Sequence, residues 1–174
     1  GRETILMKLL FENWRKYLNE GDNSLFYHST PPWQAEAIEE NGLKTSSGGL
    51  GFSIAGTWAD EIYGGRPIYL SIEPGKGGGR EYEGTVFEVD TRGLQLYPDL
   101  PTLVDYGAYV EEEGVYWEPE AVPEEMSPFV DDDGMLYFED LLAPGHPAAN
   151  AVMAMTGTAV SLNDIPPDRI KRIS

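Results

Sequence analysis

Apolar residues near the start of the chain recur at the spacing of a helix. From Leu6 to Leu18 they lie three or four positions apart, which predicts an amphipathic helix over residues 4–19. A glycine–aspartate pair follows and would end this helix. We therefore interpret residues 1–22 as an N-terminal helical extension. Its apolar side either packs on the rest of the chain or contacts a protein partner.

The rest of the chain alternates short apolar strands with short helices. Between residues 98 and 147, prolines and acidic residues interrupt every pattern. We expect one α+β domain of many short strands over residues 23–174, with an acidic insertion at about residues 98–150. The predicted strands are 25–28, 67–73, 85–90, 94–97, 158–162 and 170–173, and the predicted helices are 33–41, 57–63 and 148–155. Residues 115–117 are a further candidate strand, and residues 135–142 favour either a short helix or a strand.

Charge and composition narrow the classes of function. The chain has 174 residues, is 41% hydrophobic, contains no cysteine and carries a net charge of −18. The absence of cysteine excludes disulfides, thiolate zinc sites and a cysteine nucleophile. All Lys and Arg lie outside residues 93–168, a stretch with 16 Asp or Glu. This excess of negative charge disfavours nucleic acid as a partner; the stretch is either a solvated acidic surface or a site for cations or a basic protein.

The chemistry-bearing candidates begin with His28, at the end of the first predicted strand. Ser29 and Thr30 follow it and precede the predicted helix. A strand-to-helix turn of this kind offers an imidazole, hydroxyls and backbone N–H groups to a ribose or a phosphate. The alternative is a histidine at a strand end whose hydrogen bonds are satisfied within the fold.

Five short segments together resemble the ADP-ribosyltransferase-like superfamily. That superfamily includes mono-ADP-ribosylating toxins, rifampin-modifying enzymes and RNA 2′-phosphotransferases, and the small bacterial and phage members are the most similar. The match is carried by the order and spacing of the segments rather than by any one of them. The segments are Phe26–Thr30, Ala37–Leu43, Pro67–Ser71, Thr85–Asp99 and Asn163–Ile170.

The resemblance implies a split β-sandwich that binds NAD as its substrate in a cleft. In such proteins a histidine hydrogen-bonds the adenosine-side ribose and a tyrosine stacks on nicotinamide, roles that would fall to His28 and Tyr69. Ser29, Thr30 and Ser71 would lie beside the bound dinucleotide. An acidic residue then stabilises the positive charge that builds on the sugar as nicotinamide departs.

Two positions of the resemblance stay open. Phe52-Ser53, followed by a predicted helix, matches the second motif as well, in which case Phe52 is the stacking aromatic and Tyr69 is a core residue. The acid is expected near the strand before the Ile-Pro-Pro segment, but residues 156–160 contain no carboxylate. Glu118 and Glu120 have the spacing of the paired acids of the family but come earlier in the chain. Pro119 between them places them at an edge or in a loop.

The resemblance favours a NAD-dependent mono-ADP-ribosyltransferase-like protein that transfers ADP-ribose to a protein or small-molecule acceptor. The alternative is a catalytically degenerate module of the same fold that serves in binding or as a structural part of a phage-associated particle. RNA 2′-phosphotransfer fits the negative charge poorly. We expect no metal site, because the run at 131–134 lacks the spacing of a calcium loop. With no run of 18 apolar residues, we expect a soluble protein, cytoplasmic or virion-associated, rather than a membrane protein. The predicted counter-charges for the NAD pyrophosphate are Lys44, Arg66, Lys76, Arg80 and Arg92.

Overall fold

The computed structural model describes residues 25–45, 58–74, 76–77, 80–81 and 84–173. The chain divides into two compact units at residues 96–97 and 157–158. We call the described residues up to residue 96 and from residue 158 onward the sheet unit. Residues 97–157 are the acidic unit. The predicted N-terminal helix and the alternative aromatic Phe52, with Ser53, lie outside the described residues.

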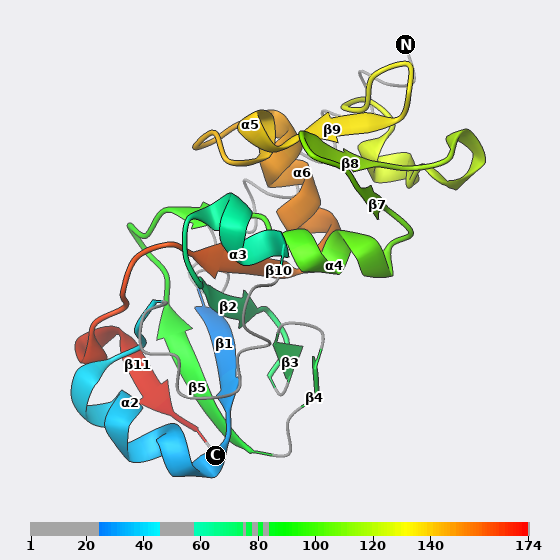
Figure 1. Cartoon of the computed structure of the whole chain (residues 1–174). Coiled ribbons are helices and arrows are strands. Elements are labelled where there is room, and N and C mark those ends of the chain that lie inside the picture. The colour runs from blue at the N-terminus through cyan, green and yellow to red at the C-terminus, as the bar shows by residue number, and fades with distance from the viewer. Residues whose placement is uncertain (1–24, 46–57, 75, 78–79, 82–83, 174) are drawn as a thin grey trace. The chain divides into compact units, whose positions relative to one another are not determined.

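An antiparallel sheet forms the centre of the sheet unit (Figure 1), and β6 spans the boundary between the units. Its strands follow the order β11-β5-β1-β2-β10-β6. A two-stranded hairpin of β3 (Lys76–Gly77) and β4 (Arg80–Glu81) follows β2. The strands of the large sheet are β1 (Leu25–Thr30), β2 (Ile68–Ser71), β5 (Thr85–Asp90), β6 (Leu96–Tyr97), β10 (Thr158–Ser161) and β11 (Ile170–Arg172).

Side chains on one face of this sheet form the apolar core of the unit. Phe26 pairs with Val89 across β1 and β5, and Leu70 pairs with Ala159 across β2 and β10. All four side chains are at most 1% exposed, as expected for apolar residues on one face of half-buried strands. The short helices of the unit are η2 (Pro32–Gln34), α2 (Ala35–Asn41), α3 (Trp58–Tyr63) and η5 (Pro167–Arg169).

The loop after α2 is held against the C-terminal segment. Leu43 and Ile165 exchange two backbone hydrogen bonds of 2.9 Å. Gly42, with φ of +79°, comes so close that a Cβ atom there would lie 2.2 Å from the carbonyl oxygen of Ile165. Only glycine fits this position, because it tolerates both the positive φ and the approach of the second backbone.

The acidic unit contains a second, three-stranded antiparallel sheet in the order β7-β8-β9. Trp117, Leu103, Met126 and Leu141 are completely buried and form its core together with α6. Its elements are α4 (Leu100–Asp105), β7 (Tyr109–Val110), β8 (Gly114–Tyr116), η3 (Pro119–Ala121), η4 (Glu124–Met126), β9 (Met135–Tyr137), α5 (Phe138–Leu141) and α6 (Pro147–Thr156).

The predicted fold class is confirmed as far as a mixed α+β structure with antiparallel sheets of short strands. The segment at 135–142, for which both a helix and a strand were open, contains both, because β9 passes directly into α5. The helix α4 was not predicted. No helix within the described ranges is long and apolar enough to cross a membrane.

Candidate functional site

His28 lies within β1 rather than at its end. The strand continues through Ser29 and Thr30, and all six residues of β1 pair with β5. The expectation of a strand-to-helix turn at these residues is therefore wrong, and the turn comes at Pro31. The backbone N–H groups of β1 that point toward β5 belong to a ladder and are therefore not available to a ligand.

The His28 ring is fixed by one hydrogen bond to the main chain of β2. Its Nδ1 lies 2.8 Å from the carbonyl oxygen of Tyr69. A carbonyl only accepts, so Nδ1 carries the proton and donates. Burial lowers the pKa of His28 below its usual value, and the bond to Tyr69 opposes this only in part. The ring is therefore neutral at pH 7, with a lone pair on Nε2, and Nε2 has no protein partner among the described residues.

β1 and β2 are joined at a single position, and this opens the sheet beside His28. Tyr27 pairs with Ser71, whereas β1 and β5 pair over their full length. Along β1 the antiparallel register would next bring Ser29 opposite Tyr69, where no pairing is formed. At this open seam the Tyr69 carbonyl receives its hydrogen bond from the His28 ring. In a continuous sheet a backbone N–H of the neighbouring strand would donate it.

The register places His28 and Tyr69 on opposite faces of the sheet. Side chains alternate along a strand, and directly paired residues share a face. Tyr69 and Ser29 thus share the face of the Tyr27–Ser71 pair, while His28 shares the core face of Phe87. The structure thus places Tyr69, Ser29 and Ser71 on one face of the sheet. The His28 side chain belongs to the other face, and its ring meets this group through the hydrogen bond to the Tyr69 carbonyl.

The predicted hydroxyl residues differ in what they bind. Thr30 donates to the Gln34 side chain at 2.8 Å, and the Ser71 hydroxyl accepts from the backbone N–H of Glu73 at 3.1 Å. Ser29 is 7% exposed, and its hydroxyl has no partner within the described part of the chain. A buried hydroxyl without a partner is costly, so Ser29 is the member of this group with hydrogen-bonding capacity to spare.

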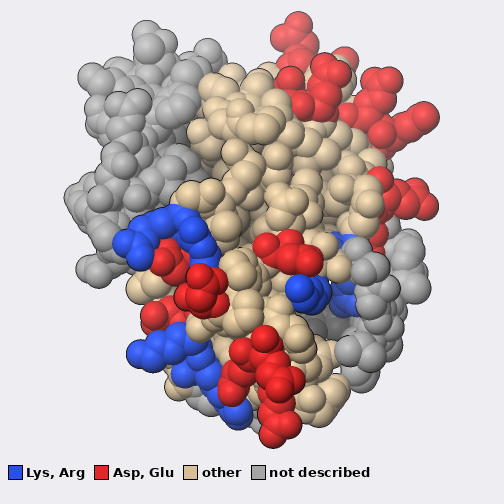
Figure 2. All heavy atoms as spheres, turned by 90° about the vertical axis from the view of Figure 1, so that its left-hand side faces the viewer, with Lys and Arg blue, Asp and Glu red and all other residues tan. Residues whose placement is uncertain are grey.

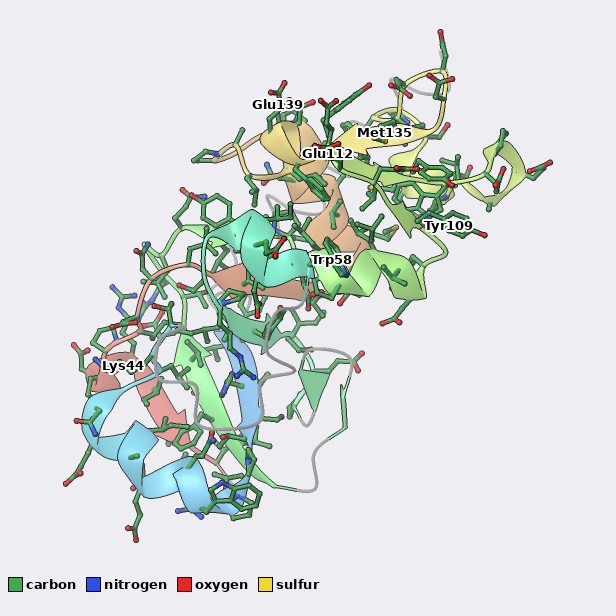
Figure 3. The ribbon with its side chains drawn as sticks, in the orientation of Figure 1. Lys44, Trp58, Tyr109, Glu112, Met135 and Glu139 are labelled. Atoms are coloured by element: carbon green, nitrogen blue, oxygen red, sulfur yellow. The ribbon has the colours of Figure 1, made fainter. Side chains whose placement is uncertain are left out.

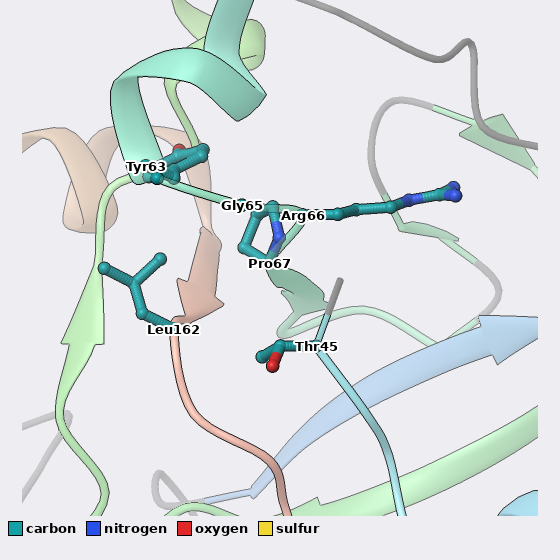
Figure 4. Close-up of a pocket in the computed structure, with 7 residues that line it drawn as sticks. Thr45, Tyr63, Gly65, Arg66, Pro67 and Leu162 are labelled. Atoms are coloured by element: carbon teal, nitrogen blue, oxygen red, sulfur yellow. The ribbon is translucent and has the colours of Figure 1, made fainter. Parts of the chain in front are cut away.

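A small open pocket lies directly before β2 (Figure 4). It has a volume of about 90 Å³ and is lined by Thr45, Leu162 and the turn from Tyr63 to Pro67. The Arg66 side chain extends from this turn away from Tyr63 and Leu162. Pockets that hold whole organic ligands are about 300–1,000 Å³. This one is therefore large enough only for a fragment of a dinucleotide.

The Arg66 side chain makes no hydrogen bond or ion pair with a described residue. Arg92 is bound to Asp90 at 2.6 Å, and Lys44 lies 3.6 Å from Asp164. The side chains of Lys76 and Arg80 lie outside the described residues. Figure 2 shows Lys and Arg interspersed with Asp and Glu over the sheet unit. Of the predicted counter-charges whose side chains the structure describes, Arg66 is thus the one that is not bound to a described carboxylate.

No carboxylate occupies the late strand of the sheet unit. β10 reads Thr-Ala-Val-Ser. Asp164, which follows it, accepts from the backbone N–H and the hydroxyl of Thr45 at 2.8 and 3.0 Å and serves to hold that loop. Glu118 and Glu120 are exposed residues at η3 of the acidic unit.

Sequence reasoning did not consider Glu88, which is half-buried on β5. It pairs with Tyr27 and therefore lies on the face that carries Tyr69 and Ser71. The alternation of β5, in which Phe87 and Val89 are apolar, was the signal that Glu88 points away from the core. Glu88 and Asp90 of β5 both share a face with Tyr69, but Asp90 is bound to Arg92. Glu88 is therefore the carboxylate of this strand that is not bound to an arginine.

Comparisons with known proteins found no match. No family model, no curated protein and no solved structure corresponds to this chain. The functional argument therefore rests on the geometry of the seam between β1 and β2 and on the motifs in the sequence.

Proposed function

We propose that the sheet unit binds NAD at the seam between β1 and β2 and that the protein is an ADP-ribosyltransferase of the kind its motifs resemble. The observation that carries this proposal is the state of His28. Its Nδ1–H is held by the Tyr69 carbonyl, and the lowered pKa keeps the ring neutral. Nε2 then accepts a hydrogen bond from a ribose hydroxyl of the dinucleotide.

Two further groups support a dinucleotide as the ligand. The Ser29 hydroxyl has no partner among the described residues and matches a sugar hydroxyl in size and polarity. Arg66 precedes Tyr69 by three residues, so their Cα atoms are about 10 Å apart along an extended chain. A guanidinium at that distance from the seam supplies the paired donors that a pyrophosphate requires.

In the proposed reaction the bond between the ribose anomeric carbon and the nicotinamide nitrogen breaks. Nicotinamide leaves with the bonding electron pair, a nucleophile of the acceptor bonds to the anomeric carbon, and the nucleophile gives up its proton. Positive charge develops on the sugar, so a carboxylate near it stabilises the transition state more than the ground state. Within the sheet unit, Glu88 is the candidate for this role.

A second function, binding without transfer, is favoured by one specific observation. The strand that carries the acid in the resembling family is β10, and it contains no carboxylate here. A domain that retains the imidazole, the hydroxyls and the arginine but lacks the acid would bind NAD. It would release nicotinamide no faster than NAD hydrolyses in water without a catalyst. This candidate corresponds to a degenerate binding or structural module.

The test measures NAD binding by calorimetry and nicotinamide release by chromatography on the same samples. In His28→Asn the side-chain amide can still donate to the Tyr69 carbonyl, while the Nε2 atom is lost. We expect this variant to melt near the wild-type temperature and to bind NAD at least tenfold more weakly. Arg66→Gln is expected to weaken binding about tenfold, the value of a charge-assisted hydrogen bond.

Arg172→Gln is the control for Arg66. Arg172 is also an exposed arginine of the sheet unit, and its guanidinium is bound to Glu39 of α2 at 3.2 Å, so NAD affinity should not change. Binding with nicotinamide release supports the transferase, and binding without release supports the module. Wild-type protein that shows no heat of NAD binding at millimolar concentration rules out both.

A further inference from the structure

The three-stranded sheet of the acidic unit has one core face and one exposed face. Tyr109 pairs with Tyr116, and Tyr116 pairs with Met135, so these three side chains share a face with Tyr137. The opposite face carries Val115 and Leu136, which are at most 2% exposed. We call the group of Tyr109, Tyr116, Met135 and Tyr137 the tyrosine face.

The tyrosine face is aromatic and open. The rings of Tyr109 and Tyr116 are stacked with centroids 5.2 Å apart. Tyr109 is 52% exposed and Tyr137 is 37% exposed. Large aromatic rings in this state expose apolar surface that monomeric proteins usually cover, and tyrosine is enriched at protein interfaces.

Acidic side chains surround this face. Glu111, Glu112 and Glu113 form the turn between β7 and β8, and all three are exposed; Figure 3 labels Tyr109, Glu112 and Met135 on this sheet. Tyr137 donates a 2.8 Å hydrogen bond to Asp131. The pKa of Tyr137 is raised first by that bond, with further contributions from burial and from the charges of Asp131, Glu113 and Asp133, so carboxylates of the turn and of the run at 131–133 both act on this side chain.

Among the residues of the acidic unit that the structure describes, no lysine or arginine offsets these carboxylates. Residues 93–168 contain no Lys or Arg, and His146, the histidine of the unit, caps α6 through its Nδ1. A second copy of the chain would bring the same acidic rim against itself and be repelled. The partner that this surface complements is therefore cationic.

We propose that the tyrosine face docks a Lys/Arg-rich segment of another protein. Guanidinium or ammonium groups lie over the tyrosine rings, where the negative face of each ring attracts them. Flanking cations of the segment pair with the carboxylates of the turn and of the run at 131–133. This site belongs to the acidic unit and does not depend on NAD binding by the sheet unit.

The test uses a fluorescent octapeptide of alternating arginine and serine, with a glutamate–serine octapeptide as the reference, and follows anisotropy at physiological salt. The full chain should bind the arginine peptide and not the glutamate peptide. Tyr109→Leu removes the aromatic ring without changing the charge and should weaken binding about two- to fivefold, the range for an exposed cation–π contact. Tyr109→Phe retains the ring and should bind as the wild type does.

Two controls separate the tyrosine face from general attraction to an acidic protein. Trp33→Leu removes an exposed aromatic residue of the sheet unit and should leave binding unchanged. Glu112→Gln should weaken binding more than Glu36→Gln, an equal change of charge at an exposed position of α2. The proposal is overturned if the wild type binds neither peptide, or if Tyr109→Leu matches the wild type, or if the two glutamate variants lose affinity equally.

Discussion

Asp99 offers the sharpest test of the energetics of the acidic unit. The side chain is completely buried, and its Oδ1 accepts from the backbone N–H of Thr102 at 3.3 Å at the start of α4. Oδ2 has no partner among the described residues. Burial raises the pKa of Asp99 to about 6, because the interior disfavours the charged form more than one hydrogen bond stabilises it.

The pKa determines the direction and size of the effect on stability. An unfolded aspartate has a pKa of about 3.9, so the folded state holds its proton about two units longer. The contribution of Asp99 to stability is then highest below about pH 4 and falls as the pH rises to about 6. The loss amounts to roughly 3 kcal/mol of unfolding free energy at pH 7, at about 1.4 kcal/mol for each unit.

Asp99→Asn removes this charge and retains an oxygen that accepts from Thr102. The difference in unfolding free energy between the variant and the wild type should rise by about 3 kcal/mol from pH 4 to pH 7, measured by urea denaturation at each pH. Asp132→Asn, at an exposed position of the same unit, is the control and should change the pH profile little. Parallel curves for Asp99→Asn and the wild type would refute the reasoning.

Three further predictions follow from the described contacts. Gly134→Ala should lower the unfolding free energy by at least about 2 kcal/mol, because Gly134 has φ of +76° and a Cβ atom there would lie 2.4 Å from the Trp117 carbonyl oxygen. Gly145→Ala, at φ of +71° with open space around it, should cost only about 1 kcal/mol, and equal losses would contradict the contact. In an NMR titration the His28 ring should remain Nδ1-protonated and take up its second proton below about pH 6.5; stability contributed by the neutral ring should fall as the pH drops below that value. Asp164→Asn should reduce the loss of thermal stability that the wild type shows below about pH 4, because the bonds from Thr45 and the charge of Lys44 lower the pKa of Asp164; an unchanged acid limb would contradict this.

Elements with strong local signals could be predicted from the sequence. β5 occupies the predicted residues 85–90, where apolar and β-branched residues alternate between turn signals. The last helix, α6, ends at the predicted glycine, because Gly157 adopts the left-handed conformation with φ of +66°. α4 carried a usable signal that was missed, since Asp99 and the proline two residues later are typical of a helix start.

The candidate site was less accessible to sequence reasoning because it depends on contacts between distant segments. Ser29 and Thr30 are polar, so the strand was expected to stop at His28, but pairing with β5 extends it to Thr30. The hydrogen bond that fixes the His28 ring joins residues 41 positions apart. The motifs selected His28, and only the sheet register revealed that Tyr69 lies on the opposite face.

The most direct test of the proposed NAD site follows the two ring nitrogens of His28 by NMR. In protein labelled with ¹⁵N-histidine, the Nδ1 and Nε2 resonances of His28 are assigned with the His28→Asn variant and recorded as NAD is added. A ribose hydroxyl that donates to Nε2 should shift the Nε2 resonance, while Nδ1 keeps its proton and its bond to the Tyr69 carbonyl. Resonances of His28 that stay fixed at saturating NAD, or an Nδ1 that loses its proton, would contradict the proposed site.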